Sequence, residues 1–485
     1  MKKKHGYKHL LLALASAGVM LGTWSSTASA VECTNGGTPA TTAAEDNGVA
    51  SNTACGDGAN ASGTESTALG NGANALGVDA LAVGTQAIAT GNSTSAVGGE
   101  AVATGPGATA FGWKSAANAE RSAALGHLAT ADGVRSTAVG EAANAKGLES
   151  VAVGNESAAD GIDALAVGTQ AKATGNSTSA VGGESEATGP GATAFGWKSG
   201  ANSERATALG HLAAADGVRS TAVGEAASAN GLESLAVGNE SSATGVDAIA
   251  MGTQAVANGN STTTVGGESV ATGPGATAYG WKSAANAERS TALGHLATAS
   301  GVRSTAVGEG ASAAGTRAVA IGDGATAAHT NSVAIGPGAV TTRANQVVLG
   351  NSTSTYTMPG IASADSRAAQ SGPTEIVTSD AAGNLATDGG ATWAAIGSMN
   401  SQLERNREDI DENRSGIAVA MAMKSPYVPE DKRFALSVGG GYFNSEEAAA
   451  ISAAMRATDA IQFEFAVGSG RQSAVGGRVG FTAAW

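Results

Sequence analysis

The 485-residue chain has few of the side chains from which compact domains build a core. Aromatic residues make up 4% of the sequence and charged residues 14%, whereas glycine alone accounts for 71 positions. A single core made of so much glycine and alanine would bury little apolar area per residue, and glycine loses the most conformational entropy on folding. The composition therefore excludes a set of ordinary globular domains and predicts an architecture that is repetitive or shared between chains.

The first thirty residues have the organisation of a secretory signal peptide. Lysines within the first eight residues precede an apolar run from Leu10 to Leu21, and Ala28-Ser29-Ala30 offers a small-residue cleavage site. We expect cleavage after Ala30. The alternative is an N-terminal membrane anchor, for which the apolar run is short.

Basic residues and cysteines are scarce as well. The formal net charge is −14 and the sequence contains no cluster of basic residues, so the chain is predicted not to bind nucleic acid.

Cys33 and Cys55 are the only cysteines. In an exported chain they are expected to form a disulfide that closes a short N-terminal loop, with free thiols as the alternative. A metal site would need further ligands nearby, and no metal or other cofactor is expected.

An apolar residue followed by glycine recurs every 14 residues, from Leu69-Gly70 to Leu349-Gly350, which makes 21 coils. Within a coil, small residues alternate and a second glycine follows seven residues after the first in most coils. This pattern predicts two very short strands joined by tight turns, and the glycine density excludes helix. Each coil is interpreted as one turn of a β-solenoid that pairs with the coils before and after it.

Such a coil has room for one substantial inward side chain, which we place at the residue before the first glycine. A solenoid this thin has almost no core of its own, so the inward faces of several chains are predicted to meet on a common axis. At about 4.8 Å per paired strand, the coils would form a rod on the order of 100 Å long.

A longer period of six coils brings back the stretch ATAFGWKSAANAERSAALGHLA, which begins at Ala108 and returns with small changes from Ala192 and Ala276. Its aromatic residue before the glycine is interpreted as core at a widened coil. Its Trp-Lys pair is predicted to be either part of the scaffold or a ligand contact. The second alternative is considered because an exposed tryptophan is costly and typical of binding hot spots. The three aromatic residues are Phe111, Phe195 and Tyr279, and the candidate ligand-binding residues are Trp113, Lys114, Trp197, Lys198, Trp281 and Lys282.

No motif in the chain predicts catalysis, and the protein is not expected to be an enzyme. The GPGATA sequences at Gly105, Gly189 and Gly273 imitate a dinucleotide-binding loop, but they stand in phase with the coils and no βαβ unit follows. The repeated histidines are six coils apart, so one chain cannot chelate a metal with them, although threefold rings of histidine remain an alternative. These histidines are His127, His211 and His295.

After an irregular connector, a heptad pattern predicts a short parallel coiled coil. Its apolar positions are Ile396, Leu403, Ile410 and Ile417, and the second core position of the middle heptads is filled by Asn406 and Asn413. Asparagine in the core weakens the coil but fixes its register. In a trimer, the two rings of amides could hold an anion or water.

The last sixty residues contain four segments of about ten residues in which apolar residues alternate with small or polar ones. This alternation is typical of transmembrane β-barrel strands, with a soluble antiparallel sheet as the alternative. Four strands cannot close a barrel, whereas three chains supply twelve. The thin solenoid, the heptads and the incomplete barrel all predict a homotrimer.

Together these segments resemble a trimeric autotransporter adhesin of the YadA type. The resemblance rests on the head-like NSVAIGPGA from Asn331, the neck-like ANQVVLGNSTSTYTMPGI, the asparagine layers of the stalk and an anchor that begins near GIAVAMAMKSPYVPEDK. The chain departs from the family at Ala453 and Ala454, where such anchors often carry a glycine beside the lumen helices.

The resemblance implies a mainly β protein with a trimeric left-handed parallel β-roll head, a short trimeric coiled-coil stalk and a 12-stranded anchor in the outer membrane of a Gram-negative bacterium. It implies attachment to host cells, through their receptors, or to extracellular-matrix proteins, export of the passenger through the anchor, and recognition of the strand ending at Trp485 by the outer-membrane assembly machinery. The alternative is a self-associating surface protein for autoagglutination or biofilm. The expected divisions are 1–30 signal peptide, 31–62 N-terminal segment, 63–350 head, 351–392 neck and connector, 393–424 stalk and 425–485 anchor.

Overall fold

The computed structural model describes residues 51–471 and 474–485. The predicted signal cleavage at Ala30 and the predicted disulfide partner Cys33 lie outside these residues. The chain divides into two compact units, Met1–Thr355 and Tyr356–Trp485, each of which is described by itself.

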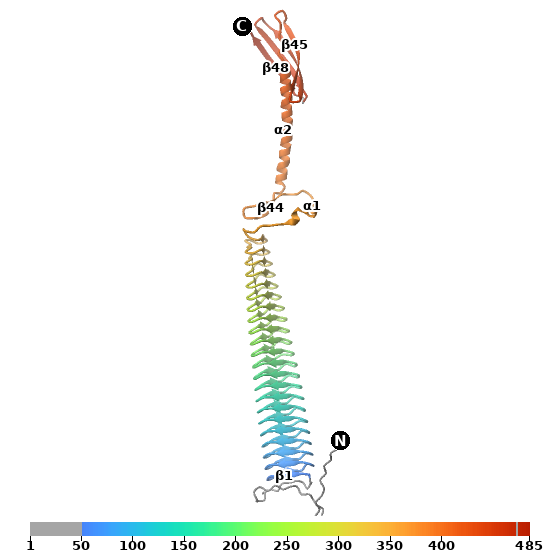
Figure 1. The fold of residues 1–485 in the computed structure, drawn as a ribbon, viewed down its shortest axis with the longest axis vertical. Helices are drawn as coiled ribbons and strands as arrows, with labels where there is room; N and C mark the ends of the chain where they lie inside the picture. The colour runs from blue at the N-terminus through green and yellow to red at the C-terminus, as the bar shows by residue number, and fades with distance from the viewer. Residues whose placement is uncertain (1–50, 472–473) are drawn as a thin grey trace, which may run out of the picture. The chain divides into compact units, whose positions relative to one another are not determined.

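The first unit is a ladder of stacked coils, which have one strand of three residues and, in all but the last two coils, one of two residues (Figure 1). Three-residue strands recur once per coil from β1 (Thr53–Cys55) to β41 (Val333–Ile335), and β42 (Val347–Leu349) ends the series. Two-residue strands recur at the same step from β2 (Asn60–Ala61) to β40 (Thr326–Ala327). Each strand pairs in parallel with its counterpart in the next coil, as β1 does with β3 (Thr67–Leu69). The predicted β-solenoid is confirmed, and it begins one coil earlier than the repeat pattern indicated because Cys55 stands where later coils have a larger apolar residue.

The interior of the coils is mostly alanine, with some serine and threonine, and the prediction that the residue before the glycine fills it is wrong. In β5 (Leu81–Val83), Ala82 is fully buried while Leu81 and Val83 face outward. A three-residue strand turns only its middle side chain inward, and the two strands of a coil are close enough that a methyl group fills the space between them. Phe111 and Tyr279 are accordingly 56% exposed in one protomer rather than core of their own coil, and Phe195 is 54% exposed.

The two outer faces of the ladder differ in chemistry. The last residue of the three-residue strands is apolar in almost every coil, from Leu69 to Leu349, with cysteine in β1. The outward residue of the two-residue strands is mixed and includes Asn74, Lys172 and Glu186. The face of the three-residue sheet is therefore continuously apolar, whereas the face of the two-residue sheet is mixed.

Two tight turns join the strands of every coil. The first turn follows the three-residue strand and the second turn precedes it. Each turn contains a residue in the left-handed region, such as Gln86 at φ 60° and Ser93 at φ 55°. Below the second turn, the buried Thr94 Oγ1 donates a 2.6 Å hydrogen bond to the Gly91 carbonyl oxygen. Such side-chain hydrogen bonds satisfy backbone carbonyl groups that are not paired by the short strands.

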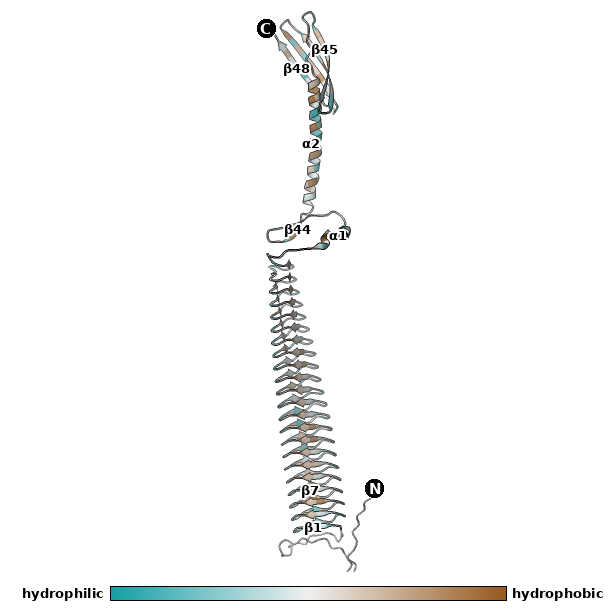
Figure 2. Cartoon of the chain, in the orientation of Figure 1, coloured by the Kyte–Doolittle hydropathy of each residue, from teal (hydrophilic) through white to brown (hydrophobic). Residues whose placement is uncertain are grey.

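The second unit begins with short elements where the sequence predicted an irregular connector. They are η1 (Pro359–Ala362), α1 (Ala364–Ala369) and an antiparallel hairpin of β43 (Val377–Ser379) and β44 (Leu385–Thr387). The stalk helix α2 (Ala391–Ala422) follows, and hydrophobic and hydrophilic residues alternate along it (Figure 2). At about 1.5 Å per residue it is about 48 Å long. Its heptad residues Ile396, Leu403 and Ile410 are exposed in one protomer, as expected of positions that pack against other helices.

Asp388 joins the hairpin to the start of α2. One carboxylate oxygen accepts a hydrogen bond from the Thr392 backbone N–H at 2.8 Å, and the other accepts from the N–H groups of Gly390 and Ile376 at 3.0 and 3.1 Å. The hydrogen bonds from Thr392, with smaller contributions from Ile376 and Gly390, lower the pKa of this carboxyl from 3.8 to about 2. The negative charge also lies at the helix N-terminus, where the helix dipole favours it.

Replacing Asp388 by alanine should fray the start of α2 in a pH-dependent way. Because the pKa of the folded state is depressed, the stabilisation by Asp388 is present above pH 3.8 and disappears as the pH falls through about 2. Hydrogen exchange of the Thr392 and Gly390 amides should differ between wild type and Asp388→Ala at pH 5 and converge near pH 2. A difference that stayed constant over this range would contradict the assignment, and Asp365→Ala in α1 is the control.

The last four strands form one antiparallel sheet in chain order: β45 (Phe434–Phe443), β46 (Glu446–Arg456), β47 (Ile461–Gly470) and β48 (Val475–Ala483). Apolar side chains such as Leu436, Phe465 and Val479 point away from α2 and are between 56% and 76% exposed. The predicted alternation is confirmed, and β45 and β48 keep free edges, so three chains bring twelve strands. None of the described helices is long and apolar enough to cross a membrane.

Candidate functional site

Trp113 lies in the first turn of its coil, two residues after β9 (Thr109–Phe111). Its ring stacks on His127 of the following coil, with centroids 4.9 Å apart and planes inclined by 17°. Lys114 Nζ lies 4.4 Å from the centroid of the same ring and 3.5 Å from Glu100 of the preceding coil. A cation against a tryptophan face and a stacked imidazole both stabilise the ring at a partly exposed site.

These neighbours cover both faces of the indole. Because Lys114 reaches toward the preceding coil and His127 belongs to the following one, the two ring faces are covered from opposite sides. Gly99, one coil before Trp113, leaves room for the ring, since a Cβ at Gly99 would come within 3.1 Å of Trp113 Cδ1. Trp113 is nevertheless 45% exposed, so what remains open is the edge of the ring.

A column of hydrogen-bonding side chains continues from the tryptophan along the ladder. His127 Nδ1 lies 3.3 Å from Glu141 Oε1, and Asn155 Nδ2 donates to Glu141 Oε2 at 3.3 Å. Trp197 and Trp281 repeat the arrangement with their own histidines at ring distances of 5.0 Å. The predicted candidates Trp113, Lys114, Trp197, Lys198, Trp281 and Lys282 are thus brought together as three equal clusters, which we call the tryptophan clusters, spaced six coils or about 29 Å apart.

The tryptophan clusters have no catalytic or metal-binding arrangement. Among residues 51–471 and 474–485, no group of three His, Cys, Asp or Glu side chains could hold a metal ion. The ion pairs are exposed and contribute little to stability on their own. What the clusters offer is a rigid aromatic edge beside a lysine, repeated three times.

Three further predicted residues occupy the second unit. Asn406 and Asn413 lie on α2 and are exposed in one protomer, and Trp485, after the end of β48, is fully exposed. Their predicted roles depend on other chains or on other proteins and stay predictions. Cys55 lies in β1.

The anchor sheet carries a row of small residues against which the stalk helix packs, and the sequence did not predict it. We call this surface, formed by the glycines named below, the glycine seat. The face of α2 that lies against the strands carries Ser415, Ala418, Val419 and Ala422, all buried. The strands meet this face with glycines, because an added Cβ at these positions would run into the helix or its side chains. They are Gly439 and Gly441 of β45, Gly468 and Gly470 of β47, and Gly476 of β48. On β46, Ala450, Ser452 and Ala454 fill the same side, so the alanines there fit the helix while glycines on the other three strands admit it.

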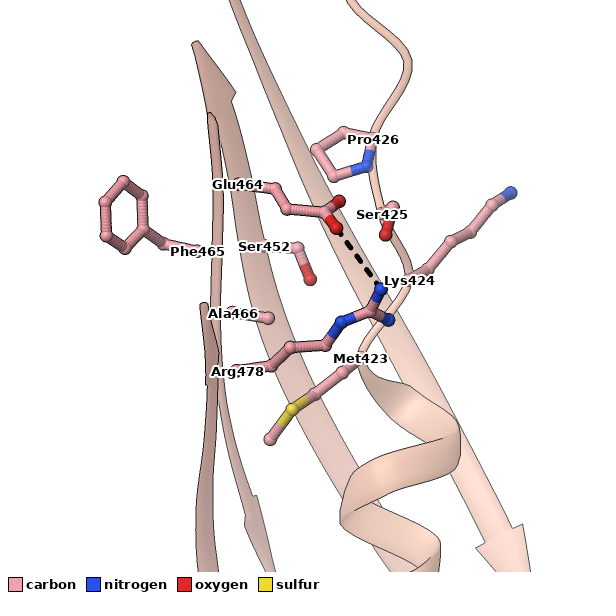
Figure 3. A pocket seen from close by; sticks show the side chains of 9 residues that line it. All are labelled: Met423, Lys424, Ser425, Pro426, Ser452, Glu464, Phe465, Ala466 and Arg478. Atoms are coloured by element: carbon pink, nitrogen blue, oxygen red, sulfur yellow. Dashed lines mark hydrogen bonds and ion pairs between the residues drawn. The ribbon is translucent and has the colours of Figure 1, made fainter. Parts of the chain in front are cut away.

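At the C-terminal end of α2 the sheet carries one ion pair (Figure 3). Arg478 Nη2 lies 3.2 Å from Glu464 Oε1, and only 9% of Glu464 is exposed. The segment that leaves the helix is held to the sheet close by, since Arg456 donates to the Val428 carbonyl at 2.6 Å and Gln462 donates to that of Pro426 at 3.2 Å. These bonds position the turn of the chain from helix to first strand.

Arg478→Ala should weaken the anchor, because it leaves a nearly buried carboxylate without its cation. Breaking a buried pair costs about 3–5 kcal/mol, and the half-exposed arginine reduces this to about 2 kcal/mol here. The loss should appear as a lower temperature for dissociation of the trimer in detergent. Arg478→Ala combined with Glu464→Gln should recover part of the loss, and a double variant weaker than Arg478→Ala would contradict the pairing.

Comparison with known proteins gives matches to two family models. The model of the YadA head domain repeat matches eleven segments between residues 53 and 339, and that of the YadA-like membrane anchor domain matches residues 426–485. Among solved structures, the chain is similar to the collagen-binding domain of the Yersinia adhesin YadA, with 25% sequence identity over 36% of this chain and 73% of that chain and a TM-score of 0.19. No curated protein matches the chain.

Proposed function

Because the chain belongs to the family of YadA-type trimeric autotransporter adhesins, whose members are homotrimers held in the outer membrane with the head exposed at the cell surface, we propose that it attaches bacteria to host cells or to extracellular-matrix proteins. The family is one of structural adhesins and not of enzymes. Within this chain we assign 63–350 to the head, together with the coil that begins at Thr53, then 351–392 to the connector, 393–424 to the stalk and 425–485 to the anchor.

The regular stacking of the head is the observation that carries the proposal. Three blocks of six coils repeat most of their surface residues at intervals of about 29 Å along one rod. An extended ligand can engage several equal surfaces at once, and the second and later contacts form at high effective concentration. Weak single contacts then add up to firm attachment.

We further propose that the three-residue sheets of three heads face the common axis, which covers the apolar column that one protomer leaves exposed. Leu125, Ile321 and Leu349 belong to this column and are 38%, 39% and 43% exposed in one protomer. The two-residue sheets then face the host.

The anchor is proposed to conduct the passenger of its own chain to the surface. The glycine seat supports this role, since it accepts a helix lengthwise against the strands while the chain turns back at Met423–Pro426. Once export is complete, the same seat would hold α2 in the lumen and close it.

A second candidate function is autoagglutination. Successive coils expose an apolar side chain at the second turn, at Val134, Leu148 and Ile162, each between 37% and 45% exposed. Apolar residues repeated along a surface favour association with an equal surface on another cell.

Attachment can be tested with cells that display the full chain. They should bind collagen, laminin, fibronectin or host cells better than cells that display residues 351–485 alone. Equal binding would contradict the adhesin proposal, and rapid sedimentation of the full-chain cells without matrix binding would favour autoagglutination instead.

A further inference from the structure

In a closed trimer of parallel coils, the first turn of each chain lies beside the second turn of the next. This follows from cyclic symmetry, which joins unlike edges around the axis. Two columns of residues flank the three-residue sheet at equal distance: the first-turn column two residues after each strand, and the second-turn column two residues before it. In the coil of β9 these are Trp113 and Gly107. The comparison of the two columns rests on the trimer and on the axis proposed above.

The columns complement each other in size. Gly107 has φ 70°, but Ser93 and Arg121 occupy the same position of the neighbouring coils at 55° and 56°, so the backbone does not require glycine there. A Cβ at Gly107 would only make an ordinary contact with Arg121 Cγ at 3.5 Å. The positive φ after Pro106 favours glycine, but space within one protomer does not require it.

The described part of the second-turn column has glycine at three levels, and each is the level of a tryptophan in the first-turn column. The pairs are Gly107 with Trp113, Gly191 with Trp197, and Gly275 with Trp281. The largest side chain of one column thus always stands at the level of the smallest residue of the other. This coincidence has a physical reason if the tryptophan of one chain fills the space beside the glycine of the next.

At two further levels of each block, the polar residues of the two columns also complement each other. Two coils after each tryptophan, a glutamate of the first-turn column shares its level with an arginine of the second-turn column: Glu141 with Arg135, Glu225 with Arg219, and Glu309 with Arg303. One coil further, the first two blocks pair Asn155 with Glu149 and Asn239 with Glu233, whereas the third block pairs Asp323 with Arg317. Both members change together, and the pair stays complementary.

The third block also carries charges that one protomer does not satisfy. In the earlier blocks, Arg135 and Arg219 form ion pairs with glutamates of the next coil at 2.9 and 2.7 Å. In the third block that glutamate is replaced by Arg317. Within the described residues of one protomer, Arg303, Arg317 and Asp323 have no ion pair. Two arginines about 4.8 Å apart on neighbouring coils repel each other unless acidic groups face them.

We propose that the two columns form the seam between neighbouring heads, with the tryptophan of one chain packed beside the glycine of the next and with Glu309 and Asp323 facing Arg303 and Arg317 of the next chain. The tryptophan clusters then serve assembly. Contact with the host is then left to the two-residue sheet, whose outward residues at two levels are aliphatic in the first and third blocks and charged in the second: Ile88 and Val102, Val256 and Val270, and Lys172 and Glu186.

Disulfide cross-linking of the full chain in the outer membrane tests the seam. In a background with both native cysteines replaced by serine, Gly191→Cys with Trp197→Cys should yield a covalent trimer on denaturing, non-reducing gels, because three seams link three chains. Each single variant should stay monomeric on such gels. The matched control is Trp197→Cys with Glu233→Cys. Glu233 lies in the second-turn column like Gly191 but three coils further along the head, so this pair should not cross-link.

Charge exchange gives an independent measurement that does not depend on cysteine geometry. Asp323→Arg should lower the temperature at which the head melts, since it replaces an acidic partner of the seam by another cation beside Arg303 and Arg317. Asp323→Arg combined with Arg317→Asp should restore most of that temperature. Thr298→Arg on the two-residue sheet adds the same charge away from the seam and should leave the melting temperature nearly unchanged.

The outcomes separate the seam from the function on which it rests. A heat-resistant trimer without the 191–197 cross-link, or charge exchange without recovery, would overturn the seam while the adhesin proposal stands. Absence of any trimer would overturn both. Triple replacement of Trp113, Trp197 and Trp281 by alanine should lower the melting temperature of the head; unchanged melting with lost matrix binding would show that the rings contact the ligand instead.

Discussion

Gly196→Ala is expected to unfold the middle of the head although it adds one methyl group. Gly196 follows β21 (Thr193–Phe195) and has φ 135°, a conformation closed to residues with a side chain. A Cβ there would overlap the carbonyl oxygen of Gly210 in the next coil. Strain and overlap together should destabilise the affected coils by about 3 kcal/mol or more.

The effect should be local at first, because each coil of a solenoid contacts only its neighbours. Limited proteolysis should cut Gly196→Ala near residue 196 under conditions that leave the wild-type head intact, and thermal unfolding should split into two steps. The control is Gly310→Ala. Gly310 has φ 59° with nothing near its absent Cβ, and Ala142 and Ala226 already occupy the equivalent position in other coils. That variant should lose about 1 kcal/mol at most, and equal damage by both substitutions would contradict the distinction between the two glycines.

The head shows how far a repeat can be interpreted from sequence. The constant length of the coils gives strands, turns and parallel stacking directly, since a strand in one coil has the same neighbours as its copy in the next. The direction of the side chains does not follow from the period. The repeat pattern places Val83 inside because an apolar residue recurs at its position, yet the two strands are so close that only Ala82 fits between them. Volume, not hydropathy, decides which residue is inside such a thin coil.

The sequence predicts Trp113 and Lys114 as candidate contacts but does not predict the side chains that surround them. Trp113 and Lys114 are adjacent and can be recognised together, whereas the partners that cover the ring, Glu100 and His127, each lie one coil away from the residue that they contact. A comparison of the sequence across coils as well as along the chain would bring them together. The glycine seat has a weaker signal, because glycines on the inner face of the strands have no visible purpose until α2 lies against them.

The seat leads to the prediction with the largest expected effect on the anchor. Gly441→Val should prevent α2 from lying against β45, because a Cβ at Gly441 would overlap the carbonyl oxygen of Ala418 and come within 2.8 Å of the Ala422 nitrogen. Both atoms belong to the helix backbone, which cannot move aside without losing its other contacts with Gly468 and Gly470. We expect a loss of about 3–5 kcal/mol, as for other overpacked or disrupted core positions at the upper end of measured effects.

Gly440→Val supplies the matched control for this anchor variant. Gly440 is the preceding residue of the same strand, and its Cβ would meet only the Ala448 carbonyl oxygen at 3.9 Å. It faces the side on which Leu436 and Val438 are exposed, where an added valine suits an apolar surrounding. Gly441→Val should therefore abolish the heat-resistant trimer in outer-membrane fractions and the surface display of the head, while Gly440→Val preserves both. If Gly441→Val kept a heat-resistant trimer with a displayed head, the helix would not need the seat to complete export, and the lumen would have to be closed by contacts among the three helices along Ile410 and Ile417 instead.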